Sequence, residues 1–354
     1  MAIQKLHITD FLQLAQQHTV LDVRSPGEYN HAHIPGAHAL PLFTDEERKV
    51  VGTAYKQQGR QKAIKLGLDY FGIKMRPMVE TVEQLTQSKK TTETPTVLVH
   101  CWRGGMRSAG VAWLLDLYGF KVYTLVGGYK AYRQWVLAQF QKPYRFAIVG
   151  GYTGSGKTLV LKDLERQGQS IVDLEGLAHH KGSAFGALGE LPQPKQEMFE
   201  NLLATALAAT TQDPVFLEDE SQRIGNLTLP HPLWKQMRQA PVYFLDIPFE
   251  ERLQYLTTEY GQFEKEKLVN AIMRIQKRLG GLETKTAINH LLEDDTKACF
   301  RILLKYYDKG YTKGLQNREN WEALLNKIPC LSVDTATNTQ QIIHATAEFA
   351  EKTD

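Results

Sequence analysis

Short apolar runs alternate with segments of helical periodicity along the first part of the chain. Three such runs predict buried strands, at residues 19–23, 96–100 and 121–126. The apolar spacing over residues 107–117 predicts a helix, and strands that alternate with helices favour a parallel sheet. Pro143 interrupts the pattern, so residues 141–144 are predicted to link a first domain, residues 1–140, to a second one.

A second alternating series begins after this linker. Its predicted strands lie at residues 145–150, 170–173, 214–217, 241–246 and 328–333. Pro248 suits the first turn of a helix, and Asn338, a common N-cap residue type, is predicted to begin a last helix that ends near Lys352. The predicted fold class is α/β, with a parallel-sheet domain at residues 1–140 and an α/β domain with helical C-terminal elements at residues 141–354.

Composition adds a few constraints to this picture. The 354 residues suggest two domains, and 42% hydrophobic with 23% charged residues is typical of a globular protein. No apolar run approaches the roughly 20 residues that span a bilayer, and the N-terminus does not resemble a signal peptide, so we expect a cytoplasmic protein without membrane contact. The three cysteines are far apart, which predicts reduced thiols, with Cys299 and Cys330 in the core.

Charge is distributed unevenly, although the formal net charge is only +3. Eight basic residues against three acidic ones lie between Glu46 and Arg76. A second basic stretch runs from Lys297 to Lys313 and is interleaved with tyrosines. Two interpretations are open: solvated helix faces that flank a core stripe, or surfaces that combine phosphate contact with base stacking.

The segment CWRGGMRS, which begins at Cys101, lies between a predicted strand and a predicted helix. Backbone N–H groups at a helix N-terminus stabilise a thiolate or an oxyanion, so this position lowers the pKa of a thiol and binds anions. Arg103 and Arg107 add cationic donors for an anionic substrate. These neighbours argue against burial of the Cys101 thiol in apolar surroundings.

Several segments of the first domain resemble the rhodanese family. They are the Cys101 loop together with LDVRSPGEY, HIPGA and VGGY, at residues 21–29, 33–37 and 126–129. The resemblance implies a rhodanese-like fold and a thiol that carries sulfur or selenium. Five residues separate Cys101 from Arg107, whereas the usual sulfur-transferring loop has four and related phosphatases of the cell-cycle type have the longer spacing. We therefore expect a larger, phosphorus-bearing anion at this loop, and phosphatase activity remains an alternative.

The segment GYTGSGKT, residues 151–158, fits the P-loop pattern G-x-x-x-x-G-K-[ST], with a predicted strand before it and a helix after it. The predicted phosphate-binding residues are Gly151, Gly154, Ser155, Gly156, Lys157 and Thr158. Lys157 is expected to reach between phosphates, and Thr158 is expected to ligate Mg²⁺. Such a loop holds phosphates but does not dictate the organic group attached to them.

Acidic and basic residues after the later strands supply further candidates. Asp219, which follows an apolar strand, is predicted to position a metal or a water and to be the second Mg²⁺ ligand with Thr158. The candidates for substrate contact are Asp173, Glu175, His179, His180, Arg223, Arg274 and Arg278. The three arginines among them are equally compatible with surface ion pairs.

The order of the two motifs, with DLEGLAHH at residues 173–180, closely resembles the bacterial tRNA 2-selenouridine synthases over essentially the whole chain. The resemblance implies a rhodanese-like domain followed by a P-loop NTPase-like domain, and a two-step exchange at the wobble 2-thiouridine of tRNAs for lysine, glutamate and glutamine. Geranyl diphosphate first alkylates the thiocarbonyl sulfur. Selenophosphate then supplies selenium, and the geranylthio group leaves. A selenophosphate-supplying enzyme is an implied partner.

Within this scheme the predicted catalytic residues are Cys101, Arg103, Arg107, Lys157 and Asp219. The scheme also favours tRNA contact for the basic stretches, through Lys56, Arg60, Lys65, Arg301, Lys305 and Tyr306. Whether Cys101 forms a perselenide or only positions the donor stays open. An ATP-dependent kinase fused to a sulfurtransferase is the alternative enzyme class, and the intact thiol disfavours a rhodanese scaffold that only recruits partners.

Overall fold

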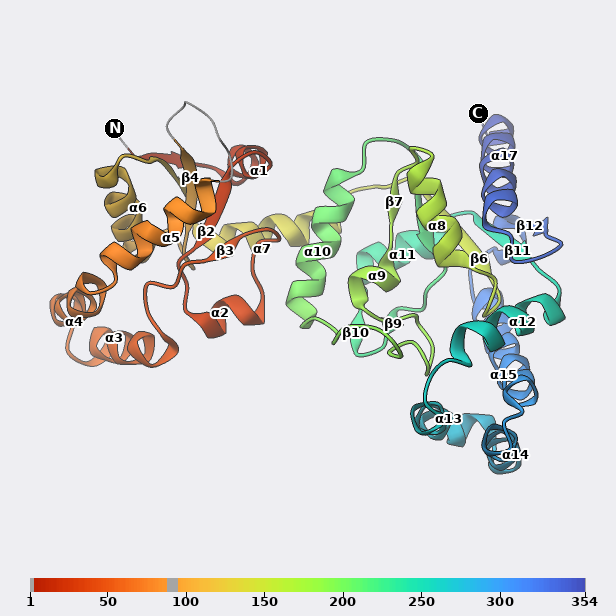
Figure 1. The fold of residues 1–354 in the computed structure, drawn as a ribbon. Helices are drawn as coiled ribbons and strands as arrows, with labels where there is room; N and C mark the ends of the chain where they lie inside the picture. Colours follow the sequence, from red (N-terminus) through yellow and green to blue (C-terminus); the bar gives the residue numbers. More distant parts are fainter. Residues whose placement is uncertain (1–2, 88–94, 354) are drawn as a thin grey trace. The chain divides into compact units, whose positions relative to one another are not determined.

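The computed structural model describes residues 3–87 and 95–353, and its contacts divide the chain into two compact units (Figure 1). Unit 1 is Met1–Gln139 and unit 2 is Phe140–Asp354. This division lies one residue from the predicted domain boundary at residue 140. A proline-containing segment separates a helix of unit 1 from the first strand of unit 2, because Pro143 cannot continue the helical hydrogen bonding.

Unit 1 is built on a parallel five-stranded sheet with the strand order β1-β5-β4-β2-β3. Its strands are β1 (Gln4–Leu6), β2 (Thr19–Asp22), β3 (His38–Ala39), β4 (Thr96–His100) and β5 (Lys121–Leu125). The predicted strands at residues 19–23, 96–100 and 121–126 correspond to β2, β4 and β5. The central strand β4 pairs with β2 and β5, and four of its residues are buried because helices cover both faces of the sheet, which explains its continuous apolar run.

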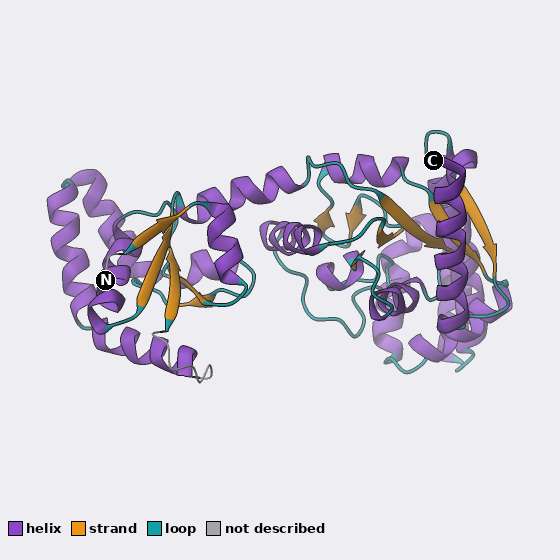
Figure 2. Ribbon diagram, turned by 90° about the horizontal axis from the view of Figure 1, so that it is seen from above, coloured by secondary structure: helices purple, strands orange, loops and turns teal. Residues whose placement is uncertain are grey.

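Helices lie on both sides of this sheet (Figure 2). They are α1 (Ile8–Ala15), α2 (Pro26–His31), α3 (Asp45–Gln57), α4 (Arg60–Gly72), α5 (Met75–Gln87), α6 (Met106–Tyr118) and α7 (Gly128–Gln139). The predicted helix at residues 107–117 is α6. Its buried Val111 and Leu115 pack in one core cluster with Leu21 of β2 and Val97 and Val99 of β4. This packing fixes α6 directly behind the loop that follows β4.

Unit 2 has a second parallel sheet, with the strand order β12-β11-β6-β8-β7. Its strands are β6 (Phe146–Gly151), β7 (Ile171–Val172), β8 (Val215–Glu218), β11 (Val242–Asp246) and β12 (Leu325–Pro329). The short strands β9 (Arg223–Ile224) and β10 (Leu227–Thr228) form a separate antiparallel pair. The predicted α/β class is confirmed for both units.

The helices of unit 2 gather partly at the sheet and partly in a helical group after β11 (Figure 1). They are α8 (Lys157–Arg166), α9 (Leu174–Ala178), α10 (Gln196–Ala209), α11 (His231–Gln239), α12 (Phe249–Tyr260), α13 (Lys265–Leu279), α14 (Gly281–Leu292), α15 (Thr296–Gln316), α16 (Trp321–Leu324) and α17 (Thr335–Thr353). A core of their own, with Leu253, Ile272, Leu291 and Leu303, holds α12 to α15 together. No helix in the described ranges is long and apolar enough to cross a membrane.

Two predictions near the C-terminus were wrong in placement. The last strand lies at Leu325–Pro329 rather than at residues 328–333, because the chain leaves the sheet soon after Cys330 donates its N–H to the Asp246 carbonyl. The last helix begins at Thr335, and Asp334 caps it by accepting from the Thr337 N–H at 2.8 Å. Asn338 lies inside this helix instead, and its side-chain amide donates to the Ser332 carbonyl at 3.0 Å.

Candidate functional sites

Cys101 lies directly after β4, at the carboxyl edge of the sheet of unit 1, and the helix α6 begins five residues later. The start of α7 holds the loop between them: the Tyr129 N–H donates to the Cys101 carbonyl at 2.8 Å and the Lys130 N–H donates to the Trp102 carbonyl at 3.0 Å. Gly128 allows this approach, since a Cβ there would lie 2.3 Å from the Cys101 carbonyl oxygen and its φ is +59°. The thiol loop therefore has a fixed backbone.

The Cys101 side chain is 3% exposed, so the expectation that its neighbours would keep it from burial was wrong. Its Sγ nevertheless lies 3.2 Å from the Ser108 hydroxyl oxygen. Burial raises the pKa of the thiol, but hydrogen bonds from the Ser108 side chain and backbone and the positive charge of Arg107 outweigh it and lower the pKa overall. The predicted lowering of the pKa is confirmed, and Ser108 is a contributor that the prediction did not assign.

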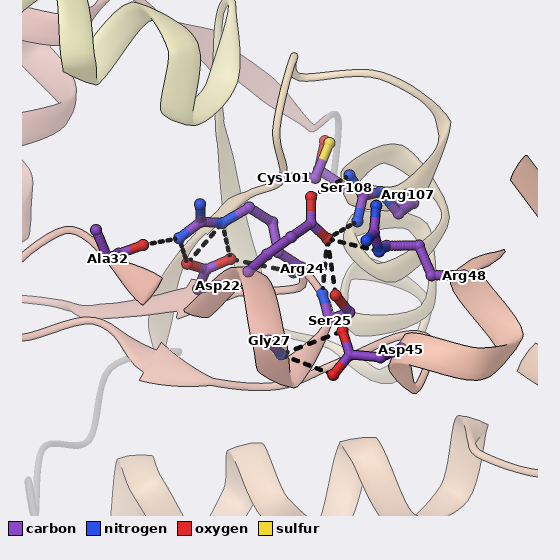
Figure 3. Close-up of polar contacts among 11 residues, drawn as sticks. Asp22, Arg24, Ser25, Gly27, Ala32, Asp45, Arg48, Cys101, Arg107 and Ser108 are labelled. Carbon is purple, nitrogen blue, oxygen red and sulfur yellow. Dashed lines mark hydrogen bonds and ion pairs between the residues drawn. The ribbon is translucent and has the colours of Figure 1, made fainter. Parts of the chain in front are cut away.

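Arg107 is engaged by a carboxylate (Figure 3). Its guanidinium donates to Glu28, with Nη1 2.7 Å from Oε2 and Nη2 3.3 Å from Oε1. Burial raises the pKa of Glu28, but Arg107 and further hydrogen bonds lower it to about 2, so Glu28 is ionised at neutral pH. Glu28 also accepts from the Ser25 N–H at the start of α2, in an S-x-x-E capping box that is legible in the sequence. The neighbouring Arg103 is exposed.

Asp22 and Arg24 form a buried ion pair near the thiol loop (Figure 3). Arg24 is 1% exposed, bonds to both carboxylate oxygens of Asp22 and donates to the Ala32 carbonyl at 2.7 Å. Its guanidinium carbon also lies 3.8 Å from the centre of the Tyr129 ring. The next residue to Cys101, His100, is fully buried, and burial lowers its pKa to about 4, so it is uncharged at neutral pH.

The P-loop of unit 2 joins β6 to α8. Gly154 has a φ of +82°, and a Cβ there would lie 2.8 Å from Leu256, so the loop needs glycine at this position. Lys157 Nζ donates to the Gly151 carbonyl at 3.0 Å, and the Gly151 N–H donates to the Tyr311 hydroxyl at 3.2 Å. Tyr311 of α15 thus contacts the phosphate-binding loop directly, which the sequence pattern did not indicate.

A cavity of about 1960 Å³ opens over the P-loop. The predicted residues that line it are Gly154, Ser155, Gly156, Lys157, Thr158, Glu175, His180, Asp219, Arg223, Arg274, Arg278 and Tyr306. Asp173 and His179 do not line it. The Asp173 carboxylate caps α9 by accepting from the Gly176 N–H at 2.6 Å, and His179 Nδ1 lies 2.9 Å from the Pro192 carbonyl oxygen. These two substrate candidates therefore have local structural contacts instead.

The arginines of the cavity are available for an anion. Arg274 and Arg278 lie on α13 and are exposed, and the exposed Arg223 donates to the Gly225 carbonyl at 3.0 Å. Among the described residues, none of the three forms an ion pair with a carboxylate within 4.0 Å, so the alternative of surface ion pairing is not observed for them. The cavity therefore combines P-loop amides, Lys157 and three guanidinium groups.

The carboxylate beside the P-loop threonine is Glu175, not Asp219. Thr158 Oγ1 donates to Glu175 Oε2 at 2.7 Å, whereas Asp219 accepts from the Tyr311 hydroxyl at 2.6 Å and pairs with Arg318. Thr158 and Asp219, the predicted Mg²⁺ ligands, both line the cavity but have different hydrogen-bond partners. The described residues contain no cluster of three or more histidine, cysteine or acidic side chains arranged for a metal.

A further acid, Glu220, lies in the cavity wall next to Glu175. Burial and the Glu175 charge raise the pKa of Glu220 well above its ordinary value, although Lys157 opposes this. The sequence placed Glu220 in the acidic run after β8 but gave no reason to distinguish it from Asp219. The two acids differ because Asp219, and not Glu220, forms the ion pair with Arg318, a residue about 100 positions away in the sequence.

The two basic stretches differ in the structure. Lys56, Arg60 and Lys65 are exposed on α3 and α4 and make no ion pair with a described carboxylate, as expected for a polyanion surface. The second stretch is α15, where Arg301 pairs with Glu250 and Lys305 is exposed.

The tyrosines of α15 are half-buried and face the P-loop cavity. Tyr306 lines the P-loop cavity, its ring centre lies 5.2 Å from that of Tyr307, and the Tyr307 hydroxyl accepts from the Ala184 N–H at 3.3 Å. Helical periodicity turns these rings inward, so they form part of the cavity wall rather than an outer surface.

A thiol loop at the end of a central parallel strand, followed in the same chain by a P-loop with its own sheet, defines a rhodanese-like domain joined to a P-loop domain. A model of the rhodanese-like domain matches residues 8–134, and a model described as the tRNA 2-selenouridine synthase AAA domain matches residues 144–327. The chain belongs to the tRNA 2-selenouridine synthase family.

Individual relatives agree with this assignment. The tRNA 2-selenouridine synthase of Shewanella piezotolerans is 37% identical over 84% of this chain and 89% of its own length. The protein of that name from Hydrogenovibrio crunogenus is 35% identical over 85% of this chain and 90% of its own length.

Among solved structures, the N-terminal domain of a putative ATP/GTP binding protein from Clostridium difficile is similar to 38% of this chain and 99% of that chain, at 38% identity and a TM-score of 0.35.

Proposed function

We propose that this chain is a tRNA-modifying transferase that converts wobble 2-thiouridine to 2-selenouridine through an S-geranyl-2-thiouridine intermediate. The tRNAs for lysine, glutamate and glutamine are the proposed acceptors, and geranyl diphosphate and selenophosphate are the proposed donors. The observation that carries this proposal is the cavity over the P-loop, where Lys157 and the unpaired Arg274 and Arg278 face the same space. Its volume of about 1960 Å³ accommodates a prenyl diphosphate together with a nucleobase.

The first step is an alkylation in the P-loop cavity. The thiocarbonyl sulfur attacks C1 of geranyl diphosphate, a carbon–sulfur bond forms, the carbon–oxygen bond breaks, and diphosphate leaves. The proton from N3 of the base leaves with the diphosphate or through a carboxylate. Negative charge grows on the departing diphosphate, so Lys157, the P-loop amides and the cavity arginines stabilise the transition state where that charge develops.

The second step is a selenium-for-sulfur exchange at the thiol loop. Selenium from selenophosphate bonds to C2 of the alkylated base, geranylthiol leaves, and water cleaves the selenium–phosphorus bond to release phosphate. Arg103 and Arg107 are the proposed contacts for the anionic donor, next to Cys101 with its lowered pKa. A selenophosphate-supplying enzyme is the proposed partner of this step.

A reconstituted reaction tests the proposal. Purified protein is incubated with thiolated tRNA, geranyl diphosphate and selenophosphate, and the wobble nucleoside is identified by mass spectrometry. We expect selenouridine with both donors and geranylated thiouridine when selenophosphate is omitted, and neither product with tRNA that lacks the 2-thio group. Absence of both products would overturn the proposal, and ATP hydrolysis stimulated by a small acceptor would favour the kinase alternative.

A further inference from the structure

Trp102, the residue next to the reactive thiol, has an exposed indole ring. Its exposed fraction is 38%, whereas the aromatic side chains behind it, Tyr129 and Tyr132, are completely buried. Neither step of the proposed reaction gives Trp102 a role. The exposed ring lies next to the thiol, at the place where the proposed substrate approaches.

The contacts of Trp102 hold the ring in one place. Its carbonyl accepts from the Lys130 N–H at 3.0 Å, so the backbone on which the ring is mounted is tied to the start of α7. The indole lies against Tyr129, with the ring centres 5.6 Å apart and the planes inclined by 38°. Tyr129 in turn carries the Arg24 guanidinium 3.8 Å from its ring centre. The Arg24 guanidinium carbon also lies 6.0 Å from the centre of the indole, so Arg24, Tyr129 and Trp102 form a packed cluster of planar groups of which the indole is the exposed member.

The exposed part of the indole presents aromatic surface on which a further planar group can stack. Stacking on an aromatic side chain is the usual way in which proteins hold an unpaired base of RNA, and it contributes about 1–3 kcal/mol per base. The exposed Arg103, the proposed contact for the anionic donor, follows Trp102 directly. Aromatic face, cation and thiol therefore occur on three consecutive residues, Cys101 to Arg103.

We propose that Trp102 is the stacking platform for the alkylated wobble base while C2 of that base reacts at the Cys101 loop. This inference rests on the proposed function and adds a positioning residue to it. The platform orients the base by contact between two flat rings, so a substitution that removes the aromatic face weakens substrate binding more than it slows the chemical step.

The test uses an RNA anticodon stem-loop that carries S-geranyl-2-thiouridine at the wobble position, together with selenophosphate and the full chain. Trp102→Leu keeps an apolar contact with Tyr129 but has no aromatic face, and Trp102→Phe keeps a smaller face. We expect Trp102→Leu to raise KM about 10-fold with kcat changed less than threefold, as the loss of one stacked base predicts. Trp102→Phe is expected to recover most of that loss.

Trp113→Leu is the matched control, because Trp113 is 51% exposed and lies two turns into α6, away from the thiol. We expect this variant to keep the KM of the wild type. If the role of Trp102 were only structural, its substitution would lower the melting temperature of the protein and change the pH at which Cys101 ionises. Either change in both Trp102 variants, without a rise in KM, would contradict the stacking platform.

The result for the wild type separates the two claims. Wild-type protein that does not selenate the stem-loop contradicts the proposed function itself. Wild-type protein that does selenate it, with Trp102→Leu showing a KM within twofold of the wild type, contradicts the platform and leaves the proposed function standing.

Discussion

At the scale of single residues, the acidity of Cys101 is the balance of opposing effects. Burial at 3% exposure disfavours the thiolate, and the Ser108 hydroxyl at 3.2 Å together with the Arg107 charge favours it more strongly. Arg107 is shared with Glu28, so its charge does not act on the thiol alone. The lowered pKa of the Cys101 thiol therefore depends most on the hydrogen bond with Ser108.

Replacing Ser108 by alanine removes the side-chain hydrogen bond and leaves burial in place. We expect the pKa of Cys101 to rise, so that the thiolate forms at higher pH. The measurement is thiolate ultraviolet absorbance against pH, with Cys101→Ala as the baseline. Cys299 and Cys330 do not interfere near neutral pH, because burial raises their pKa values to about 12 and about 11. An unchanged midpoint would show that Ser108 does not stabilise the thiolate.

Glu28 gives a second pH dependence, whose sign follows from its lowered pKa. An acid whose pKa is lower in the folded state stabilises the fold above its unfolded value of 4.5, and this contribution is lost as the pH falls towards about 2. Glu28→Gln is therefore expected to reduce the free energy of unfolding at pH 7 and to make little difference near pH 2. Urea unfolding at several pH values measures this, and a loss that is independent of pH contradicts the ion pair with Arg107.

At the scale of elements, the turn between β5 and α7 shapes the thiol loop. Gly128→Ala combines a positive φ, which costs about 1–2 kcal/mol, with a Cβ only 2.3 Å from the Cys101 carbonyl oxygen. We expect it to reduce the free energy of unfolding by more than 2 kcal/mol and to abolish selenation while geranylation continues. The matched control is Gly36→Ala, where φ is +80° but nothing lies within 4 Å of the added Cβ.

Gly36→Ala is expected to cost only about 1 kcal/mol and to keep both steps of the reaction. Urea unfolding and product analysis of the two variants compare them. Equal losses of stability in both would mean that the clash with the thiol loop is not the cause.

The elements themselves were largely predictable from the sequence, for a physical reason. Strands such as β4 and β11 are buried on both faces, so their apolar runs are continuous and hard to mistake. The strand β12 has only one buried residue, Ile328, so its apolar pattern is weak and the strand was predicted three residues too late. The P-loop and the thiol loop were predictable because glycines and charged residues at fixed spacing define them.

The rest of the sites was not predictable because it depends on contacts between distant residues. The pairing of Asp219 with Arg318, the contact of Tyr311 with Gly151 and the pairing of Arg107 with Glu28 join residues 79 to 160 positions apart. No local pattern encodes such pairs. For Glu28 the sequence gives part of the answer: its capping box indicates that the carboxylate is held at the start of α2, but not that Arg107 is its partner.

At the scale of the whole molecule, three predicted tRNA contacts on α3 and α4, Lys56, Arg60 and Lys65, are exposed and pair with no carboxylate of the described residues. Replacing Lys56, Arg60 and Lys65 together by alanine is expected to weaken tRNA binding and to reduce the slope of log K against log salt by about 2–3, since each lost phosphate contact accounts for about 0.7–0.9. Fluorescence anisotropy at several salt concentrations measures the slope. Arg76→Ala is the control, because Arg76 already pairs with Glu80 at 2.7 Å, and an unchanged slope in the triple variant would remove these residues from the surface.

In the proposed function, one chain carries two successive reactions at two separate sites. Product analysis of two variants by mass spectrometry of the wobble nucleoside tests it most directly. We predict that Cys101→Ala accumulates geranylated thiouridine without selenouridine. Lys157→Ala is predicted to lose geranylation by about 100-fold yet to selenate tRNA that was geranylated beforehand. Loss of both reactions in both variants, with the fold intact, would show that the two reactions do not occur at separate sites.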